Sequence, residues 1–150
     1  MKAVIQRVKR ASVTVNEAET RSIGRGLMIL LGVQDTDSFD ICEKLAKKCA
    51  ELRIFEDEQG KLNLSAQGLG LEALVVSNFT LYADTKKGRR PSFVRAAKPP
   101  LADGAYDRFV EELRETGLAG VQTGTFGADM QIELVNDGPV TIVIETDDWK

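Results

Sequence analysis

The order of hydrophobic periodicities along the chain limits its fold more than any other feature of the sequence. Near the N-terminus, apolar residues recur at every second position, as at Ala11, Val13 and Val15, which is typical of β-strands. Two later stretches, residues 38–53 and 100–116, carry apolar residues at helical spacing. Three more strand patterns end the chain, at residues 121–126, 130–135 and 140–146. We therefore predict an α+β fold, with an antiparallel, barrel-like β-sheet and two helices packed on it.

The segments between these patterns predict the remaining elements. Thr36 and Asp37 precede the first helix pattern, and either is a residue type that caps helix N-termini. Residues 83–101 show no periodicity and are predicted to form a long loop, which in a compact domain is a mild sign of function. The other expected elements are a hairpin turn at residues 16–19, a central strand at 27–33 and a short buried strand at 74–76.

The length and composition set the domain count and the broad class. With 150 residues, of which 43% are hydrophobic and 29% charged, we expect one globular domain over residues 1–150. The longest apolar run, residues 27–31, is far shorter than the roughly 20 residues that span a bilayer. Lys2 and Arg7 lie where a signal peptide would be apolar. We therefore expect a cytoplasmic protein that does not act at a membrane.

The sequence contains no histidine. This excludes a Ser-His-Asp triad, a Cys-His pair and histidine-ligated zinc, and it removes the commonest general base near neutral pH. We see no metal site in the sequence and expect neither a metal nor a cofactor. If the protein is an enzyme, its catalysis must come from backbone donors, carboxylates, Lys, Ser, Thr or Cys, or from the substrate itself.

The two cysteines, Cys42 and Cys49, lie seven residues apart in the first helix pattern. That spacing places them on one helix face, about 10 Å apart along the axis, which is too far for a disulfide. We interpret both as small apolar core residues, because free cysteine is often buried.

One segment is strongly basic, although the net charge of the chain is −3. On an acidic protein, such a loop favours a local contact with phosphates over general binding to nucleic acid. The simpler interpretation is a loop kept in solvent by its charge. Between Thr85 and Lys98 there is no acid, and the six basic residues are Lys86, Lys87, Arg89, Arg90, Arg95 and Lys98.

Two short motifs lie where strands are predicted to end. Residues 77–80, Ser-Asn-Phe-Thr, follow a buried strand, where successive N–H groups can form an oxyanion hole or the hydroxyls can simply cap a turn. Residues 136–139, Asn-Asp-Gly-Pro, are predicted to be a tight connection between the last two strands. An X–Pro bond in a folded protein is cis in only about 5–6% of cases, so local reasoning favours an ordinary turn.

Together these motifs resemble the signatures of the bacterial and eukaryotic D-aminoacyl-tRNA deacylases. Residues 77–81, Ser-Asn-Phe-Thr-Leu, are similar to that family's Ser-Gln-x-Thr-Leu, and residues 136–141 match its Asn-x-Gly-Pro-Val/Phe-Thr. The similarity runs from end to end, through residues 1–8, 52–57 and 126–130. Asn78 departs from the family pattern, in which Gln carries one methylene more.

The resemblance implies a homodimer that hydrolyses the ester between a D-amino acid and the terminal adenosine of tRNA, and that also clears glycine from mischarged tRNA. It implies that Gly138 and Pro139 are joined by a cis peptide, reach into the partner subunit's pocket and exclude L side chains. A filter of that kind cannot reject glycine, which has no side chain. The residues expected to contact the acceptor stem are Lys86, Lys87, Arg89 and Arg90.

The same resemblance implies roles for the first motif. Backbone N–H groups of Phe79 and Thr80 would stabilise the oxyanion, supported by Ser77 and Asn78, and main-chain groups at Phe126 would hold the substrate amine. Catalysis is then attributed largely to the 2′-hydroxyl of the tRNA. A nucleophilic Thr80 hydroxyl is the lesser alternative, because no base is available to activate it.

Two functions of other classes stay open. A non-catalytic RNA-binding module would use the basic loop and bind tRNA with strong salt dependence. Aromatic residues make up only 6% of the chain, and Phe93 is the only one in the loop, which supplies a base-stacking platform poorly. A thiol-based hydrolase or redox protein would need a reactive Cys42 or Cys49, which an apolar helix face disfavours.

Overall fold

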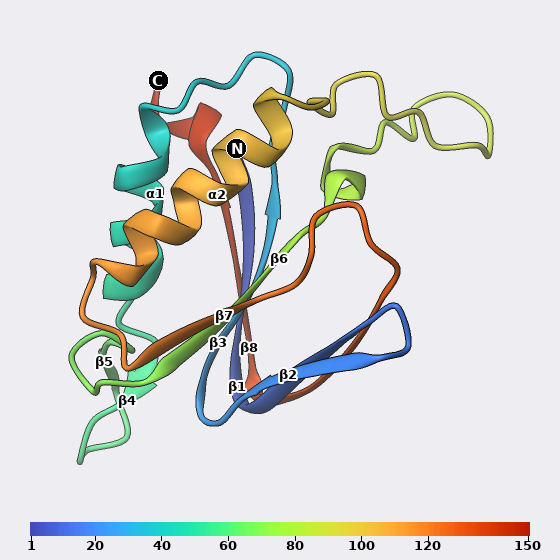
Figure 1. The fold of residues 1–150 in the computed structure, drawn as a ribbon. Coiled ribbons are helices and arrows are strands. Elements are labelled where there is room, and N and C mark those ends of the chain that lie inside the picture. Colours follow the sequence, from blue (N-terminus) through green and yellow to red (C-terminus); the bar gives the residue numbers. More distant parts are fainter.

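Six strands form one sheet, and both α-helices pack on the same face of it (Figure 1). The computed structural model describes residues 1–150. The strands are β1 (Lys2–Val15), β2 (Glu19–Ile23), β3 (Gly26–Gly32), β6 (Glu72–Ser77), β7 (Gly120–Thr123) and β8 (Met130–Glu145). The helices are α1 (Ile41–Glu51), α2 (Leu101–Arg114) and the short 3-10 helices η1 (Phe79–Tyr82) and η2 (Thr146–Trp149). A small separate hairpin consists of β4 (Phe55–Glu56) and β5 (Leu62–Leu64).

The α+β class and the barrel-like sheet with two helices are confirmed, but the sheet is mixed. Strand order is β2-β1-β3-β6-β7, with β8 paired to β1. β1 is antiparallel to β2, β3 and β8, whereas β6 runs parallel to both β3 and β7. The helices explain the difference, because α1 connects β3 to β6 and α2 lies between β6 and β7, and parallel strands need such crossover connections.

β8 is a single strand of 16 residues where the sequence predicted two strands and a tight connection, so that prediction was wrong. Gln6 pairs with Thr141 and Val8 with Asn136, so residues 137–140 bulge out opposite Arg7. The long β1 pairs with β8 on both sides of the bulge. The turn-like residues therefore lie within one ladder and do not reverse the chain. The strand expected at 121–126 is also shorter, since β7 ends at Thr123.

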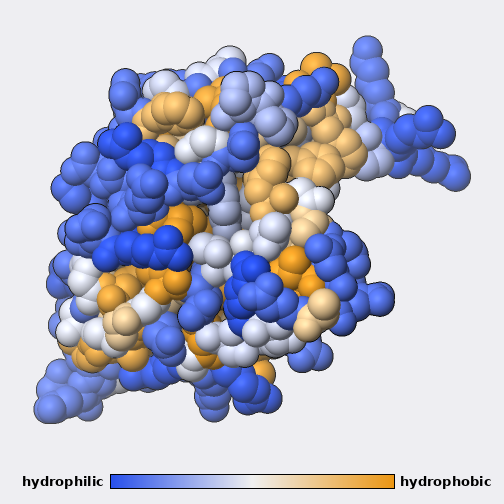
Figure 2. Space-filling model, in the orientation of Figure 1, coloured by the Kyte–Doolittle hydropathy of each residue, from blue (hydrophilic) through white to orange (hydrophobic).

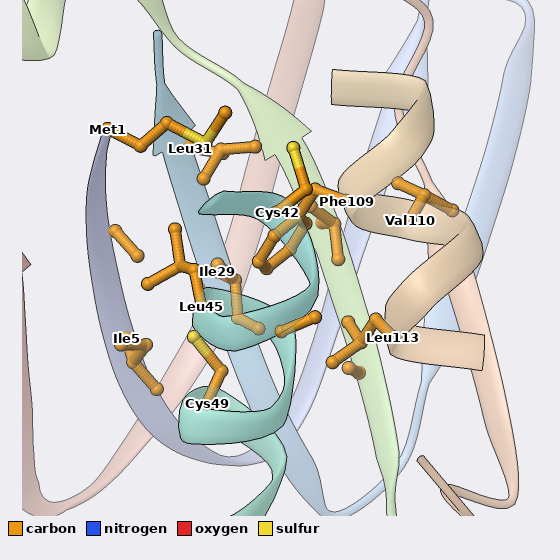
Figure 3. Close-up of a cluster of buried hydrophobic side chains, with 14 of the residues drawn as sticks. Met1, Ile5, Ile29, Leu31, Cys42, Leu45, Cys49, Phe109, Val110 and Leu113 are labelled. Atoms are coloured by element: carbon orange, nitrogen blue, oxygen red, sulfur yellow. The ribbon is translucent and has the colours of Figure 1, made fainter. Parts of the chain in front are cut away.

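Two hydrophobic clusters form the core. The first lies between the sheet and the helices and contains Cys42 and Cys49, which are free and buried as predicted (Figure 3). The second packs β1 against β2, β3 and β6. A register shift near Lys9 and Arg10 lets one strand serve both clusters, the first through its N-terminal half and the second through its C-terminal half.

The other local predictions hold except at the start of the first helix. The hairpin turn, β3, β6 and α2 lie where they were expected. α1 begins at Ile41 instead of residue 38, and neither Thr36 nor Asp37 caps it. The carboxylate of Asp37 instead accepts hydrogen bonds from the N–H of Gln34 and the ammonium of Met1, each at 2.8 Å. Neither α-helix has the length and apolar character needed to cross a membrane.

Candidate active site

A cavity of about 440 Å³ opens at the end of β6, where the chain enters η1. Its volume is in the range of small-ligand sites. The walls come from four parts of the chain: Val33 after β3, the β6–η1 junction, the end of the long loop with the first turn of α2, and residues 126–130, which follow β7. The lining residues that matter for the chemistry are Ser77, Asn78, Phe79, Phe93, Lys98 and Phe126.

Asn78 holds the β6–η1 junction in place. Its N–H donates to the main-chain oxygen of Leu31 at 2.8 Å, which ties the junction to β3. Its side-chain oxygen caps η1 by accepting hydrogen bonds from the N–H of Thr80, at 3.3 Å, and from the Thr80 hydroxyl. Thr80 does not line the cavity, and its hydroxyl donates to an amide oxygen that cannot act as a base. Of the two predicted oxyanion donors, only Phe79 therefore lies at the cavity.

Phe79 and Phe93 form an aromatic pair at the cavity. Phe79 is 56% exposed, and its ring lies edge-on to that of Phe93 with 5.1 Å between the ring centroids. In the sequence Phe93 is the only aromatic residue of the basic loop, so the pair could not be predicted from it. Only the return of the loop to the body of the protein brings the two rings together.

The segment that carries Phe126 is hydrogen-bonded to β2, the strand at the opposite edge of the sheet from β7. Arg21 on β2 donates from Nη1 to the main-chain oxygens of Thr123 and Gly124, at 2.8 and 3.0 Å. The N–H of Gly124 in turn donates to the oxygen of Val75 at 3.1 Å. The Arg21 bonds join β2 to the end of β7 across the open side of the sheet, and the Gly124 bond ties the segment to β6 beside the cavity. No local motif around Arg21 indicates this role.

Gly138 and Pro139 lie in the bulge of β8 and are joined by a cis peptide. Both are exposed, and neither lines the cavity of its own chain. Arg7 is buried beneath the bulge, where its Nε donates to the main-chain oxygen of Asp137 at 2.9 Å and its Nη1 to that of Ile54 at 2.8 Å. The pair is thus held at the surface, away from the motif at the end of β6.

The basic tip of the long loop projects from the body of the protein. Figure 2 shows hydrophilic side chains on this projection and hydrophobic ones gathered beside its base. Asp84 and Ser92 exchange two main-chain hydrogen bonds, of 2.7 and 2.9 Å, and close the loop at its base. The exposed basic residues of the tip are Lys86, Lys87, Arg89 and Arg90.

The thiols do not belong to the site. Burial raises the pKa of Cys42 to about 11 and that of Cys49 to about 12, and both face the core from α1 (Figure 3). A neutral, buried thiol is not a nucleophile. The geometry therefore removes the thiol-based hydrolase from consideration.

A family model described as D-Tyr-tRNA(Tyr) deacylase matches residues 4–145. The chain belongs to this deacylase family. The resemblance inferred from the two motifs is thereby confirmed. Similar proteins named D-aminoacyl-tRNA deacylase occur in Chloroflexus aurantiacus, 57% identical over 97% of this chain and 91% of the relative, and in Thermotoga petrophila, 53% identical over 97% of each. Deacylases of this family are hydrolases that act on the ester bond of aminoacyl-tRNA.

Solved structures agree with the fold of the deacylase family. One named c-Myc DNA Unwinding Element Binding Protein is 45% identical, covers 97% of this chain and 98% of its own, and has a TM-score of 0.89. A probable eukaryotic D-amino acid tRNA deacylase covers 95% of this chain and 97% of its own with a TM-score of 0.84. At 18% identity, this second likeness concerns the fold alone.

Proposed function

We propose that this chain hydrolyses the ester bond of D-aminoacyl-tRNA and releases the D-amino acid and free tRNA. The composition of the cavity carries the proposal. Its lining is mostly apolar and aromatic, with Ser77, Asn78 and one lysine as the polar residues, and it contains no carboxylate, thiol or imidazole. Such a site supplies positioning and hydrogen bonds without the imidazole or carboxylate that most often serves as general base. It suits an ester that carries its own neighbouring hydroxyl, and family membership supports the same substrate class.

In the proposed mechanism, a water oxygen attacks the carbonyl carbon of the ester while the N–H of Phe79 donates to the developing oxyanion. The ribose 2′-hydroxyl relays the proton that the water loses to the departing 3′-oxygen, so the ester C–O bond breaks and tRNA leaves with a free 3′-hydroxyl. The main chain at Phe126 holds the substrate amine. Ser77 and Asn78 keep the junction in position, and the Thr80 N–H can contribute only after it leaves Asn78.

The stereochemical filter in this proposal comes from a second subunit. Gly138 and Pro139 reach into the partner's cavity and leave no room for an L side chain, whereas D residues and glycine are accepted. Two features support this arrangement: the pair is exposed, and it is absent from the cavity of its own chain. The exposed tip residues Lys86, Lys87, Arg89 and Arg90 contact phosphates of the acceptor stem.

The proposal is tested by a paired deacylation assay, in which one tRNA is charged with D-tyrosine or with L-tyrosine. We expect release from the D-ester at least tenfold faster than from the L-ester, which corresponds to about 1.4 kcal/mol of discrimination. Equal cleavage of both esters would contradict the filter. On this proposal Pro139→Ala loses stereoselectivity and Asn78→Ala loses rate. Mixing the two variants should restore a fraction of fast, D-selective cleavage if each cavity is completed by its partner.

A second candidate is nucleic-acid binding without hydrolysis. The projecting basic loop and the likeness to a protein named for DNA binding favour it. It predicts that uncharged tRNA binds with strong salt dependence while neither tyrosyl ester is cleaved. That result would replace the hydrolase proposal.

A further inference from the structure

Lys98 is separate from the basic tip of the loop and is the only charged side chain that lines the cavity. We infer that Lys98 binds the phosphate that joins the terminal nucleoside of the tRNA to the preceding nucleotide. This rests on the proposed function, because it concerns how the same cavity holds the 3′ end. It makes Lys98 a substrate-binding residue distinct from the tip residues expected to contact the acceptor stem.

The ammonium of Lys98 is available for a ligand. The side chain is exposed and takes part in none of the ion pairs of the protein. Arg95, three residues earlier, is already engaged: its Nη2 donates to the side-chain oxygen of Gln34 at 3.1 Å, and its guanidinium lies 5.5 Å from the ring centre of Tyr82. Of the two cations at the end of the loop, only Lys98 has no partner within the chain.

The backbone of Lys98 is held while its side chain stays in solvent. The Lys98 main-chain oxygen accepts the N–H of Ala102 at 3.1 Å, in the first turn of α2. The preceding N–H, of Ala97, donates to the oxygen of Val33 at 2.9 Å. The Lys98 backbone is therefore fixed at the cavity. The ammonium can move around it on a flexible four-carbon side chain.

The surroundings of Lys98 suit a nucleotide more than a free anion. Phe79 and Phe93 line the same cavity and present an exposed aromatic surface. Sites for single-stranded nucleic acid combine aromatic rings, on which a base stacks, with cations that follow the backbone. No acidic residue lines the cavity, so no local carboxylate competes with a phosphate for Lys98.

The inference is tested with two substrates that share the ester and differ in phosphate: D-tyrosyl-tRNA, and D-tyrosyl-adenosine, which has none. For Lys98→Gln, we expect KM for D-tyrosyl-tRNA to rise about five- to tenfold at low salt, with kcat unchanged. The slope of log KM against log salt should fall by about one. Kinetics on D-tyrosyl-adenosine should stay within about twofold of the unmodified protein. Lys98→Arg should recover most of the affinity.

Controls separate the alternatives. Lys48→Gln makes the same charge change on the exposed face of α1 and should leave both substrates unaffected. An equal loss on both substrates would overturn the inference, because Lys98 would then act at the ester; an unchanged KM for D-tyrosyl-tRNA would overturn it too. If the unmodified protein cleaves neither substrate, the proposed function fails. The dissociation constant of uncharged tRNA then decides, since an unchanged value in Lys98→Gln overturns the phosphate contact.

Discussion

The guanidinium of Arg7 donates a hydrogen bond from Nε to the main-chain oxygen of Asp137, 2.9 Å away and 130 positions along the chain. Its Nη1 donates to the oxygen of Ile54 at 2.8 Å, and the residue is only 6% exposed. One buried side chain therefore joins β1, the segment before β4 and the bulge that presents Gly138. A change in this guanidinium should therefore alter the conformation of the bulge.

Arg7→Lys should weaken both the fold and the proposed stereochemical filter. Lysine carries its three N–H donors on one nitrogen and cannot reproduce the planar fork that reaches both carbonyl oxygens. We expect the free energy of unfolding to fall by about 2–4 kcal/mol, measured by urea denaturation, together with the ratio of D- to L-tyrosyl-tRNA cleavage. Arg53→Lys is the control, because Arg53 makes an exposed bond to Asn63. Full stereoselectivity in Arg7→Lys would mean that other contacts hold the bulge.

Gly138→Ala should be far more harmful than Gly60→Ala, although both glycines have positive φ. At Gly138, with φ of 141°, a Cβ would lie 2.9 Å from the Val140 nitrogen and 3.2 Å from Nη2 of Arg7. At Gly60, with φ of 77°, a Cβ meets nothing within 4 Å. We expect Gly138→Ala to lose about 1–3 kcal/mol of stability and most of its stereoselectivity. Equal behaviour of the two variants in unfolding and in the paired assay would refute this.

Thr80→Ala should retain at least a third of the deacylation rate, because the hydroxyl only donates to Asn78 and has no base beside it. Asn78→Ala should cost about 0.5–2 kcal/mol of stability through the lost cap of η1. It should also lower kcat about tenfold, because it displaces the Phe79 N–H that we propose as the oxyanion donor. Single-turnover kinetics on D-tyrosyl-tRNA compare the two. A folded but inactive Thr80→Ala would instead point to a nucleophilic hydroxyl.

Arg21→Gln should disturb the cavity from the far side of the sheet. Without the bonds to Thr123 and Gly124, the segment that carries Phe126 loses its attachment to β2. We expect kcat/KM for the D-ester to fall at least fivefold. Glu19→Gln should leave it unchanged, because Glu19 holds only the exposed side of the same guanidinium. Steady-state kinetics of the two variants decide this, and matching losses would disprove a specific effect on the cavity.

The buried thiols should make stability fall in alkali. Burial raises the pKa of Cys42 from 9.0 to about 11 and that of Cys49 to about 12. The unfolded chain therefore loses these protons at lower pH than the folded one. The contribution of the neutral thiols to the free energy of unfolding is fully present below pH 9. Above pH 9 it declines by up to about 1.4 kcal/mol per pH unit for each thiol. Urea unfolding between pH 8 and 10 should show a shallower slope for Cys42→Ala.

The native thiols should also resist alkylation. At neutral pH we expect modification of the folded protein to be slow and deacylation to be unaffected, whereas the protein in urea should react at both cysteines. Mass spectrometry after iodoacetamide treatment measures this. Rapid modification of the native protein would show that α1 opens and exposes this face.

The elements of the fold could be predicted wherever one residue pattern decides the outcome. The apolar stripes of α1 and α2, the alternation in β1 and the buried β3 and β6 were all readable from local periodicity. The parallel pairing of β6 was missed because strand direction depends on how the crossovers pack, which no single segment records. The tight connection at residues 136–139 was a wrong prediction because the pairing of β1 outweighs the turn preference of Gly and Pro.

By itself the sequence determined the element types, the absence of histidine chemistry and, through two motifs, the family. Those properties depend on neighbours along the chain or on residue identity alone. Only the tertiary structure decided that Phe93 meets Phe79, that Lys98 lies at the cavity and that Arg7 and Arg21 hold the bulge and the Phe126 segment. Each of those contacts joins residues at least 14 positions apart or places a side chain against a surface built from several segments. Hydrogen bonds and packing of that kind exist only once the sheet has closed.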